Sequence, residues 1–180
     1  MTARTSKHSF VALATVAVLL LASQARTQSR LQFPGPAPGE AQARAGHSEL
    51  VLENKALSCT WDVSKGRLTP GRVADKLSGD ALALGGAECF ELVLDDGRIV
   101  KASDLRITGA LNSRDIRPDP KSCRLAQQSA GKQITVVLTS PDEDLTVQWH
   151  GILRDGSNYV RQQITFTAKN KTIKLKEIVL

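Results

Sequence analysis

Apolar and polar residues alternate along much of the chain, and short turns rich in glycine and aspartate separate the alternating stretches. In one stretch Leu145, Val147 and Trp149 point to one side of an extended backbone, while the residues between them point to the other. An Asp-Gly turn follows at residues 155–156, and alternation resumes at Tyr159. Period-two alternation around an Asp-Gly turn is typical of a β-hairpin. The pattern therefore predicts an all-β fold of antiparallel strands.

The same alternation predicts further strands on the amino-terminal side of this hairpin. Residues 57–63 place four apolar side chains on one face, and residues 90–94 place three. The Asp-Asp-Gly sequence at residues 95–97 favours a tight turn into a return strand at residues 99–100. Other expected strands are residues 50–52, 105–107, 123–127 and 134–138, of which the last two are expected to pair.

Three segments need a separate interpretation. Residues 73–84 fit either a helix face or two short strands, but Ser-Gly-Asp lies at their centre. Glycine inside a helix costs about 1 kcal/mol relative to alanine, so we predict strand, turn and strand. Residues 112–121 contain two prolines and are predicted to form a loop. Residues 173–180 become apolar on both faces, which is typical of a strand entering a covered sheet.

Residues 1–25 are typical of a secretory signal peptide. Arg4 and Lys7 precede an apolar run over residues 10–22, and small residues precede a cleavage point after Ala25. The run is shorter than the roughly 20 apolar residues that span a membrane, so we expect no span once the signal is removed. The protein is therefore predicted to be secreted or periplasmic.

Two further regions follow the signal peptide. Residues 26–48 are rich in proline, glycine and alanine and lack a sustained apolar face, so they are predicted to form a linker. Residues 49–180 are predicted to form one antiparallel β-sandwich, long enough for a single core. Because nothing after the last apolar strand could cover it, we expect this sandwich to be incomplete at its C-terminal end.

The distribution of charge argues against nucleic acid as a partner. Removing Arg4 and Lys7 with the signal peptide lowers the formal net charge from +6 to +4. The remaining basic residues are interleaved with acidic ones, and only 4% of the residues are aromatic. Nucleic-acid binding would need a clustered basic stripe with aromatic platforms. The densest basic segment, residues 169–176, is interpreted as a solvated edge strand protected by lysines.

No arrangement of residues predicts catalysis, a metal site or a cofactor. Cys59, Cys89 and Cys123 are 30 and 34 residues apart, unlike the close pairs of metal sites. An odd number leaves at least one thiol unpaired, and whether any two form a disulfide stays open. His150 and Glu177 are the only pair that we would test for proton transfer, and structural roles are the preferred interpretation for both.

Aromatic residues on strands are the candidates for binding carbohydrate, because aromatic rings stack on sugar faces. Trp61 lies within an apolar stripe, so core packing is the preferred interpretation there. Tyr159 shares the polar face of its strand with Arg161 and Gln163. We predict Tyr159, Trp149 and Arg161 as the carbohydrate contacts.

Several runs of the sequence resemble the opening of large secreted glycoside hydrolases, namely the α-galactosidase-like family 36 and its relatives. The runs are residues 71–79 (GRVADKLSG), 90–98 (FELVLDDGR), 102–105 (ASDL), 155–162 (DGSNYVRQ) and 176–180 (KEIVL). In those proteins the corresponding region is an N-terminal β-supersandwich of the galactose mutarotase type. The resemblance covers about residues 49–180, and it implies that fold and an association with carbohydrate for this chain.

The resemblance further implies that the chain is the non-catalytic N-terminal sandwich of an exported glycoside hydrolase. The catalytic carboxylates of that family lie on a downstream (β/α)₈ barrel, and none of them maps onto this chain. We therefore expect the chain alone to be inactive and to pack on a catalytic barrel, while its parent hydrolyses O-glycosyl bonds. The alternative is a free-standing secreted carbohydrate-binding or adhesion module. A third hypothesis is a relative of aldose epimerases that uses His150, although their signature segments are missing around it.

Overall fold

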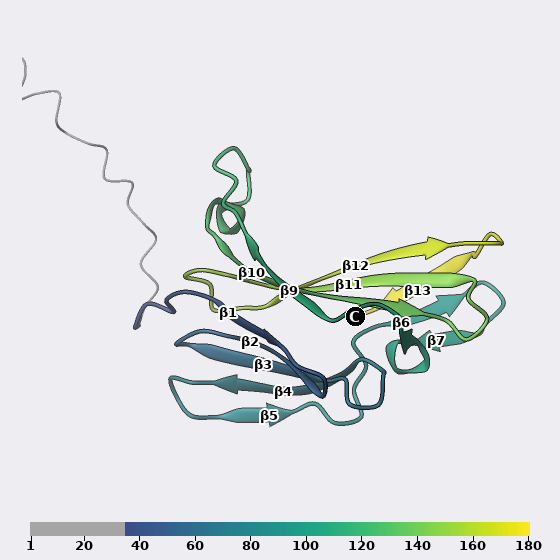
Figure 1. Ribbon diagram of the computed structural model, residues 1–180, viewed down its shortest axis with the longest axis horizontal. Coiled ribbons are helices and arrows are strands. Elements are labelled where there is room, and N and C mark those ends of the chain that lie inside the picture. The colour runs from purple at the N-terminus through teal and green to yellow at the C-terminus, as the bar shows by residue number, and fades with distance from the viewer. Residues whose placement is uncertain (1–34) are drawn as a thin grey trace, which may run out of the picture. The chain divides into compact units, whose positions relative to one another are not determined.

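The computed structural model describes residues 35–180, which contain thirteen β-strands and two short 3₁₀ helices (Figure 1). All strand pairs in this part of the chain are antiparallel. The prediction of an all-β antiparallel fold is therefore confirmed. The predicted signal peptide and the first residues of the predicted linker lie outside the described residues.

The first sheet has five strands in sequential order. Its pairing brings Leu50 opposite Trp61 and Leu52 opposite Cys59, so these four buried side chains share the inner face. The two-residue period that predicted the strands is thus also what separates the core face from the solvent face. The strands are β1 (Gln42–Ala45), β2 (Glu49–Glu53), β3 (Leu57–Asp62), β4 (Thr69–Asp75) and β5 (Ala81–Ala83).

The second sheet is built around two long central strands. The strands are β8 (Arg106–Ile107), β9 (Asn112–Ile116), β10 (Gly131–Thr139), β11 (Leu145–Arg154) and β12 (Arg161–Ala168). Strand β10 pairs with β11 along one edge and with both β8 and β9 along the other. Ile134, Val136 and Leu138 of β10 and Val147 and Trp149 of β11 have no exposed surface. They form the inner face of this sheet.

The two sheets pack face to face as a β-sandwich (Figure 1). Trp61 of the first sheet meets Trp149 of the second in an edge-to-face contact, with ring centroids 5.0 Å apart and an interplanar angle of 68°. Gly151 leaves room for this contact, because a Cβ atom there would lie 2.7 Å from the Trp149 ring and 3.1 Å from Leu52. The indole Nε1 of Trp149 donates a hydrogen bond to Gln162 of β12 (2.8 Å).

A third, three-stranded sheet lies at one end of the sandwich. Its order is β13 (Leu175–Val179), β6 (Glu91–Leu94) and β7 (Ile99–Lys101), with the 3₁₀ helix η1 (Ala102–Asp104) after β7. Phe90, just before β6, contacts Phe166 of β12 with ring centroids 5.6 Å apart. The edge strand β13 is exposed along its whole length, including Ile178 and Val179. Of the lysine-rich segment predicted as an edge strand, residues 169–176, only Leu175 and Lys176 belong to this edge strand, and residues 169–174 form the connection that precedes it.

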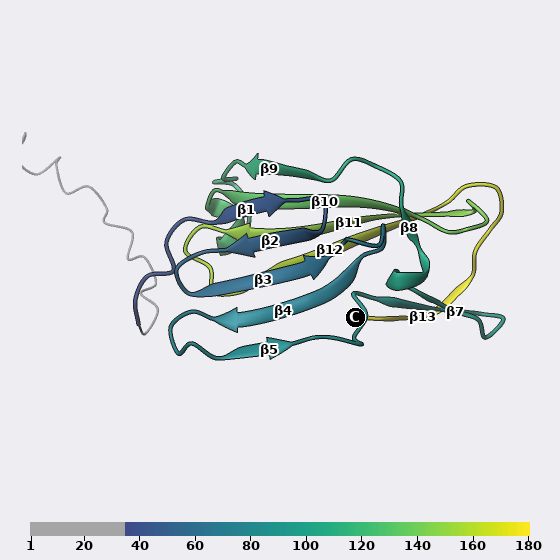
Figure 2. The same ribbon diagram turned by 60° about the horizontal axis from the view of Figure 1, so that its bottom comes forward.

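The inner face of the first sheet is covered only in part. Val73 of β4 lies opposite Cys59, and Leu82 of β5 lies opposite Val73, so both belong to the face that carries the core. Nevertheless 40% of Val73 and 64% of Leu82 are exposed. Figure 2 shows β4 and β5 extending past the second sheet. The sandwich is thus open on this side among the described residues.

Several sequence-based boundaries need correction. The folded region begins before residue 49, because β1 lies within the predicted linker and pairs with β2. Residues 112–116 form β9 rather than a loop, and they take the place beside β10 that was predicted for residues 123–127. The latter segment instead ends in the 3₁₀ helix η2 (Leu125–Gln128). The two missed strands, β1 and β9, share one cause, since main-chain pairing of short strands with few buried side chains leaves little mark in the pattern of side chains.

The turns were predicted more accurately than the polar strands. Residues 73–84 form strand, turn and strand, with Gly79 at φ +86° in the turn. The β6–β7 hairpin turns through Gly97 at φ +84°, as the Asp-Gly sequence predicted. A positive φ is readily adopted by glycine and costs other residues energy, so these two positions fix where the chain reverses.

We expect Gly151→Ala to destabilise the sandwich by about 1–3 kcal/mol, because the added methyl group would force Trp149 or Leu52 to move. The measurement is chemical unfolding of the full chain followed by tryptophan fluorescence. Gly85→Ala is the matched control, since nothing lies within 4 Å of a Cβ atom there and its φ is not positive. Equal stability of the two variants would show that the Trp61–Trp149 contact does not limit the packing of the sheets.

Candidate functional site

Two hollows in the surface meet at Tyr159, which follows the β11–β12 turn and is 52% exposed. One, which we call the polar cleft, has a volume of about 510 Å³ and lies on the outer face of the second sheet. The other, which we call the apolar groove, has a volume of about 740 Å³ and lies against the open inner face of the first sheet. Both volumes lie in the range of pockets that hold small organic ligands.

The floor of the polar cleft is one row of residues across three strands. The register aligns Gln133 of β10 with Ile152 of β11, and Ile152 with Arg161 of β12. Because these residues are paired, their side chains share the outer face of the sheet. The other side of the cleft is formed by residues 124–127, which include the first turn of η2. The cleft therefore combines a fixed sheet with a loop placed over it.

Gln133 connects the cleft to a polar network on the sheet. Although it points away from the core, it is only 5% exposed. Its Oε1 accepts a hydrogen bond from Arg114 Nη2 (3.3 Å), and its Nε2 donates to Thr135 Oγ1 (3.1 Å) and lies 3.0 Å from His150 Nδ1. Burial, together with the positive charge of Arg114, lowers the pKa of His150 below its ordinary value. The sheet beside the cleft is thus an environment that disfavours further positive charge.

Three arginines and no acidic residues line the polar cleft. Arg154 Nη1 donates to the carbonyl oxygens of Arg117 (3.2 Å) and Ser129 (2.6 Å), while its buried Nε has no hydrogen-bond partner among the described residues. Arg124 and Arg161 make no side-chain hydrogen bond or ion pair within residues 35–180. The three arginines of the cleft therefore form no ion pair with a carboxylate of the described chain.

Hydrogen bonds made by Asn54 and Asp155 fix the loop that carries Tyr159. Asn54 accepts hydrogen bonds from the backbone of Ala56 (2.9 Å) and Leu57 (3.0 Å), and it donates to the carbonyl oxygen of Ser157 (2.7 Å). Asp155 accepts a hydrogen bond from the backbone of Ala41 (2.8 Å). Because buried polar groups cost free energy unless they are paired, these bonds hold the β11–β12 turn against the first sheet.

The apolar groove is lined mainly by side chains of β3, β4 and the segments that precede β6 and β12. Among them are Trp61, Val73 and two buried thiols, Cys59 and Cys89. Burial raises the pKa of Cys59 to about 11 and that of Cys89 to about 12. Both thiols therefore stay protonated at neutral pH, which makes them poor nucleophiles. The groove is suited to apolar contact rather than to covalent chemistry.

The structure separates the three predicted carbohydrate contacts. Tyr159 and Arg161 line the polar cleft together with Gln163, as their shared parity in the sequence suggested. Trp149 has no exposed surface and is packed in the core, so it offers no face to a sugar. The missed members of the cleft are Arg124, Gln133 and Arg154, which come from a loop and from other strands. The register between strands brings Gln133 and Arg154 to Arg161, and the path of a loop brings Arg124, and sequence alone gives neither.

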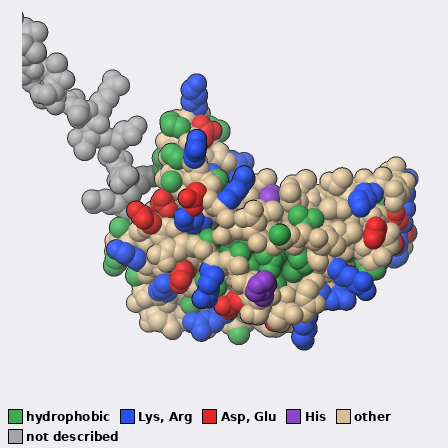
Figure 3. Space-filling model, viewed as in Figure 1, with side chains coloured by type: hydrophobic (Ala, Val, Ile, Leu, Met, Phe, Trp, Pro, Cys, Tyr) green, Lys and Arg blue, Asp and Glu red, His purple; other side chains and the backbone are tan. Residues whose placement is uncertain are grey.

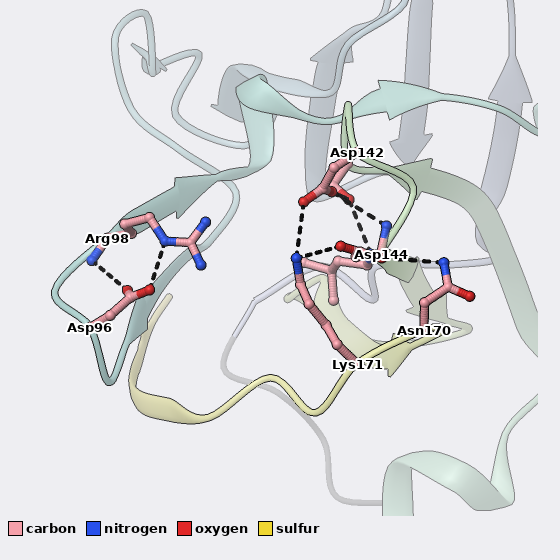
Figure 4. A network of polar contacts seen from close by, with 8 residues as sticks. Asp96, Arg98, Asp142, Asp144, Asn170 and Lys171 are labelled. Atoms are coloured by element: carbon pink, nitrogen blue, oxygen red, sulfur yellow. Dashed lines mark hydrogen bonds and ion pairs between the residues drawn. The ribbon is translucent and has the colours of Figure 1, made fainter.

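His150, Glu177 and the acidic turn at residues 142–144 make structural contacts. His150 lies in the second sheet and Glu177 in the third, so they do not belong to one site. The acidic turn before β11 is occupied by a lysine, since Lys171 Nζ pairs with Asp142 (3.5 Å) and more closely with Asp144 (Figure 4). No group of three or more His, Cys, Asp or Glu side chains within residues 35–180 is arranged to hold a metal ion.

The surface offers no continuous basic stripe on the face seen in Figure 3, where lysines and arginines are scattered and acidic residues lie between them. Within the described residues, neither 3₁₀ helix nor any other helical segment has the length and apolar character needed to cross a membrane. No protein-family model, curated protein or solved structure matches the chain. The resemblance to glycoside hydrolase sandwiches therefore remains a prediction.

We expect only one of the three cysteines to react with iodoacetamide in the native protein. Cys123 is exposed, whereas Cys59 and Cys89 are buried and their raised pKa values keep them as thiols. Mass spectrometry of the peptides should find one alkylated site, at Cys123, before unfolding and all three after it. Rapid native alkylation of Cys59 or Cys89 would contradict the burial of the groove's thiols.

Proposed function

We propose that the chain is a non-catalytic, carbohydrate-associated β-sandwich of an exported glycoside hydrolase, which packs against a catalytic barrel. One observation carries the proposal, namely the open inner face of β4 and β5. Its exposed Val73 and Leu82, together with the apolar groove, form a surface with the character of a domain core. Contiguous apolar surface of this kind marks a contact with another protein surface more often than with solvent.

The chemistry of the described residues agrees with a supporting role. The two buried cysteines are held protonated, and His150 is bound to Gln133 and Thr135 on a sheet away from Glu177. On this proposal the sandwich is of the galactose mutarotase type, it is exported through the amino-terminal signal, and the two catalytic carboxylates of hydrolysis lie on the companion barrel.

A free-standing carbohydrate-binding module is the second candidate, and the polar cleft favours it. Tyr159 offers an exposed ring at the rim, while Gln163 and Arg161 supply polar groups beside it. An aromatic face combined with a few convergent polar groups is how proteins bind sugars without acting on their bonds.

The first test is to sequence the gene beyond codon 180 and to assay the chain alone. A reading frame that continues into a (β/α)₈ barrel would support the accessory role, and an immediate stop would favour the free-standing module. Hydrolysis of aryl glycosides by the purified chain would overturn both candidates, because each assigns it no catalytic group.

The second test addresses the open face directly. We expect the full chain to bind the apolar dye anilinonaphthalene sulfonate and to self-associate with rising concentration, and we expect Leu82→Gln to weaken both effects. Ile99→Gln is the matched control, since Ile99 is 53% exposed but lies on β7 of the third sheet and not on the open face of β4 and β5. A monomer that binds no dye would contradict the use of this face for docking.

A further inference from the structure

We propose that the polar cleft binds an acidic saccharide, and that Arg124 and Arg161 donate hydrogen bonds to the carboxylate of a uronic acid unit. This inference rests on the proposed association with carbohydrate and names the class of sugar. Its basis is the composition of the cleft, in which three arginines and three glutamines surround a volume of about 510 Å³ and no acidic side chain contributes. A neutral sugar would accept hydrogen bonds from these groups, but only an acidic sugar would also pair with their positive charge.

The state of the arginines shows which of them are available to a ligand. Arg154 is committed to the backbone oxygens of Arg117 and Ser129, and so it holds the loop before β10 against the sheet. Arg124 is exposed and Arg161 half-buried, and neither guanidinium has a partner within the described residues. A guanidinium presents paired N–H donors that match the two oxygens of a carboxylate, which makes these two the direct contacts.

No acidic side chain lines this cleft, and neither Arg124 nor Arg161 forms an ion pair among the described residues. Some basic side chains elsewhere in the described chain are paired with carboxylates, as Arg98 is with Asp96 (2.8 Å) and Lys132 with Asp115. Beside the cleft, Arg114 donates a hydrogen bond to the buried amide of Gln133, which carries no negative charge. The positive charges of Arg124 and Arg161 are therefore not offset by an ion pair where the outer face of the sheet meets residues 124–127.

The size of the cleft and its aromatic rim select a saccharide among anionic ligands. Tyr159 at the rim offers a ring for the apolar face of a pyranose, while Gln127 and Gln163 offer donors and acceptors for hydroxyl groups. A nucleic acid would need a longer basic track with several stacking rings, and Tyr159 is the only aromatic residue that lines the cleft.

The test compares trigalacturonate with its methyl ester by isothermal titration calorimetry on the full chain. The two ligands share every ring and hydroxyl group and differ in the carboxylate charges. We expect the acid form to bind, the ester to bind at least tenfold more weakly, and the affinity to fall between 50 and 300 mM salt because exposed charges are screened. Arg124→Gln and Arg161→Gln should each weaken binding of the acid form about tenfold, since each removes one charge-assisted contact.

Arg98→Gln is the matched control, because it removes the same charge on the distant β6–β7 turn and should leave the affinity unchanged. Thermal unfolding of each variant, expected to match the unmodified chain, separates loss of binding from loss of folding. Equal affinity for acid and ester would overturn the inference and leave the proposed carbohydrate association intact. No binding of either ligand, or of neutral galactotriose, would overturn both. Stronger binding of an O-sulfated galactotriose or a single-stranded oligonucleotide would overturn the assignment of a carboxylate.

Discussion

The contact between Trp61 and Trp149 is the interaction on which the rest of the structure depends. It joins the inner faces of two sheets that share no main-chain hydrogen bond through their central strands, at a centroid distance of 5.0 Å. The same Trp149 reaches Gln162 with its indole nitrogen, which fixes the start of β12. Since Tyr159 and Arg161 lie just before that point, the packing of one core tryptophan determines where the polar cleft is placed.

The fold class was predictable because apolar side chains of the core alternate with polar side chains along the strands. Residues 57–63 and 145–149 show apolar side chains at every second position, and both segments supply the inner face of a sheet. The turn at Gly97 was equally clear, since aspartate followed by glycine favours the positive φ that the hairpin needs. Strands β1 and β9 were missed because their side chains are mostly exposed or small, and only their backbone groups bind the neighbouring strands.

The candidate site was predictable only within a single strand. Tyr159 and Arg161 could be placed on one face because they are two residues apart on an extended segment. Trp149 shares its face with Leu145 and Val147, so the argument from an apolar stripe that placed Trp61 in the core applies to it as well, and predicting it as a contact was wrong. Gln133 joins the site through the pairing of β10 with β11, and Arg124 through the path of a loop. Both depend on long-range geometry that no local pattern encodes.

Strand β1 has a consequence for how this protein can be handled. Among residues 35–180 it is the strand that pairs with β2 on the side opposite β3, and β2 carries three consecutive buried apolar residues, Leu50, Val51 and Leu52. The sequence alone places the domain boundary at Glu49. A chain trimmed to begin there would leave the edge of β2 that faces β1 without a partner, while its other edge would stay paired with β3. An unprotected apolar edge is a template for joining other molecules strand by strand. Strand β1 therefore protects the edge of β2 from pairing with other copies of the chain, and shortened versions of the protein should retain residues 42–45.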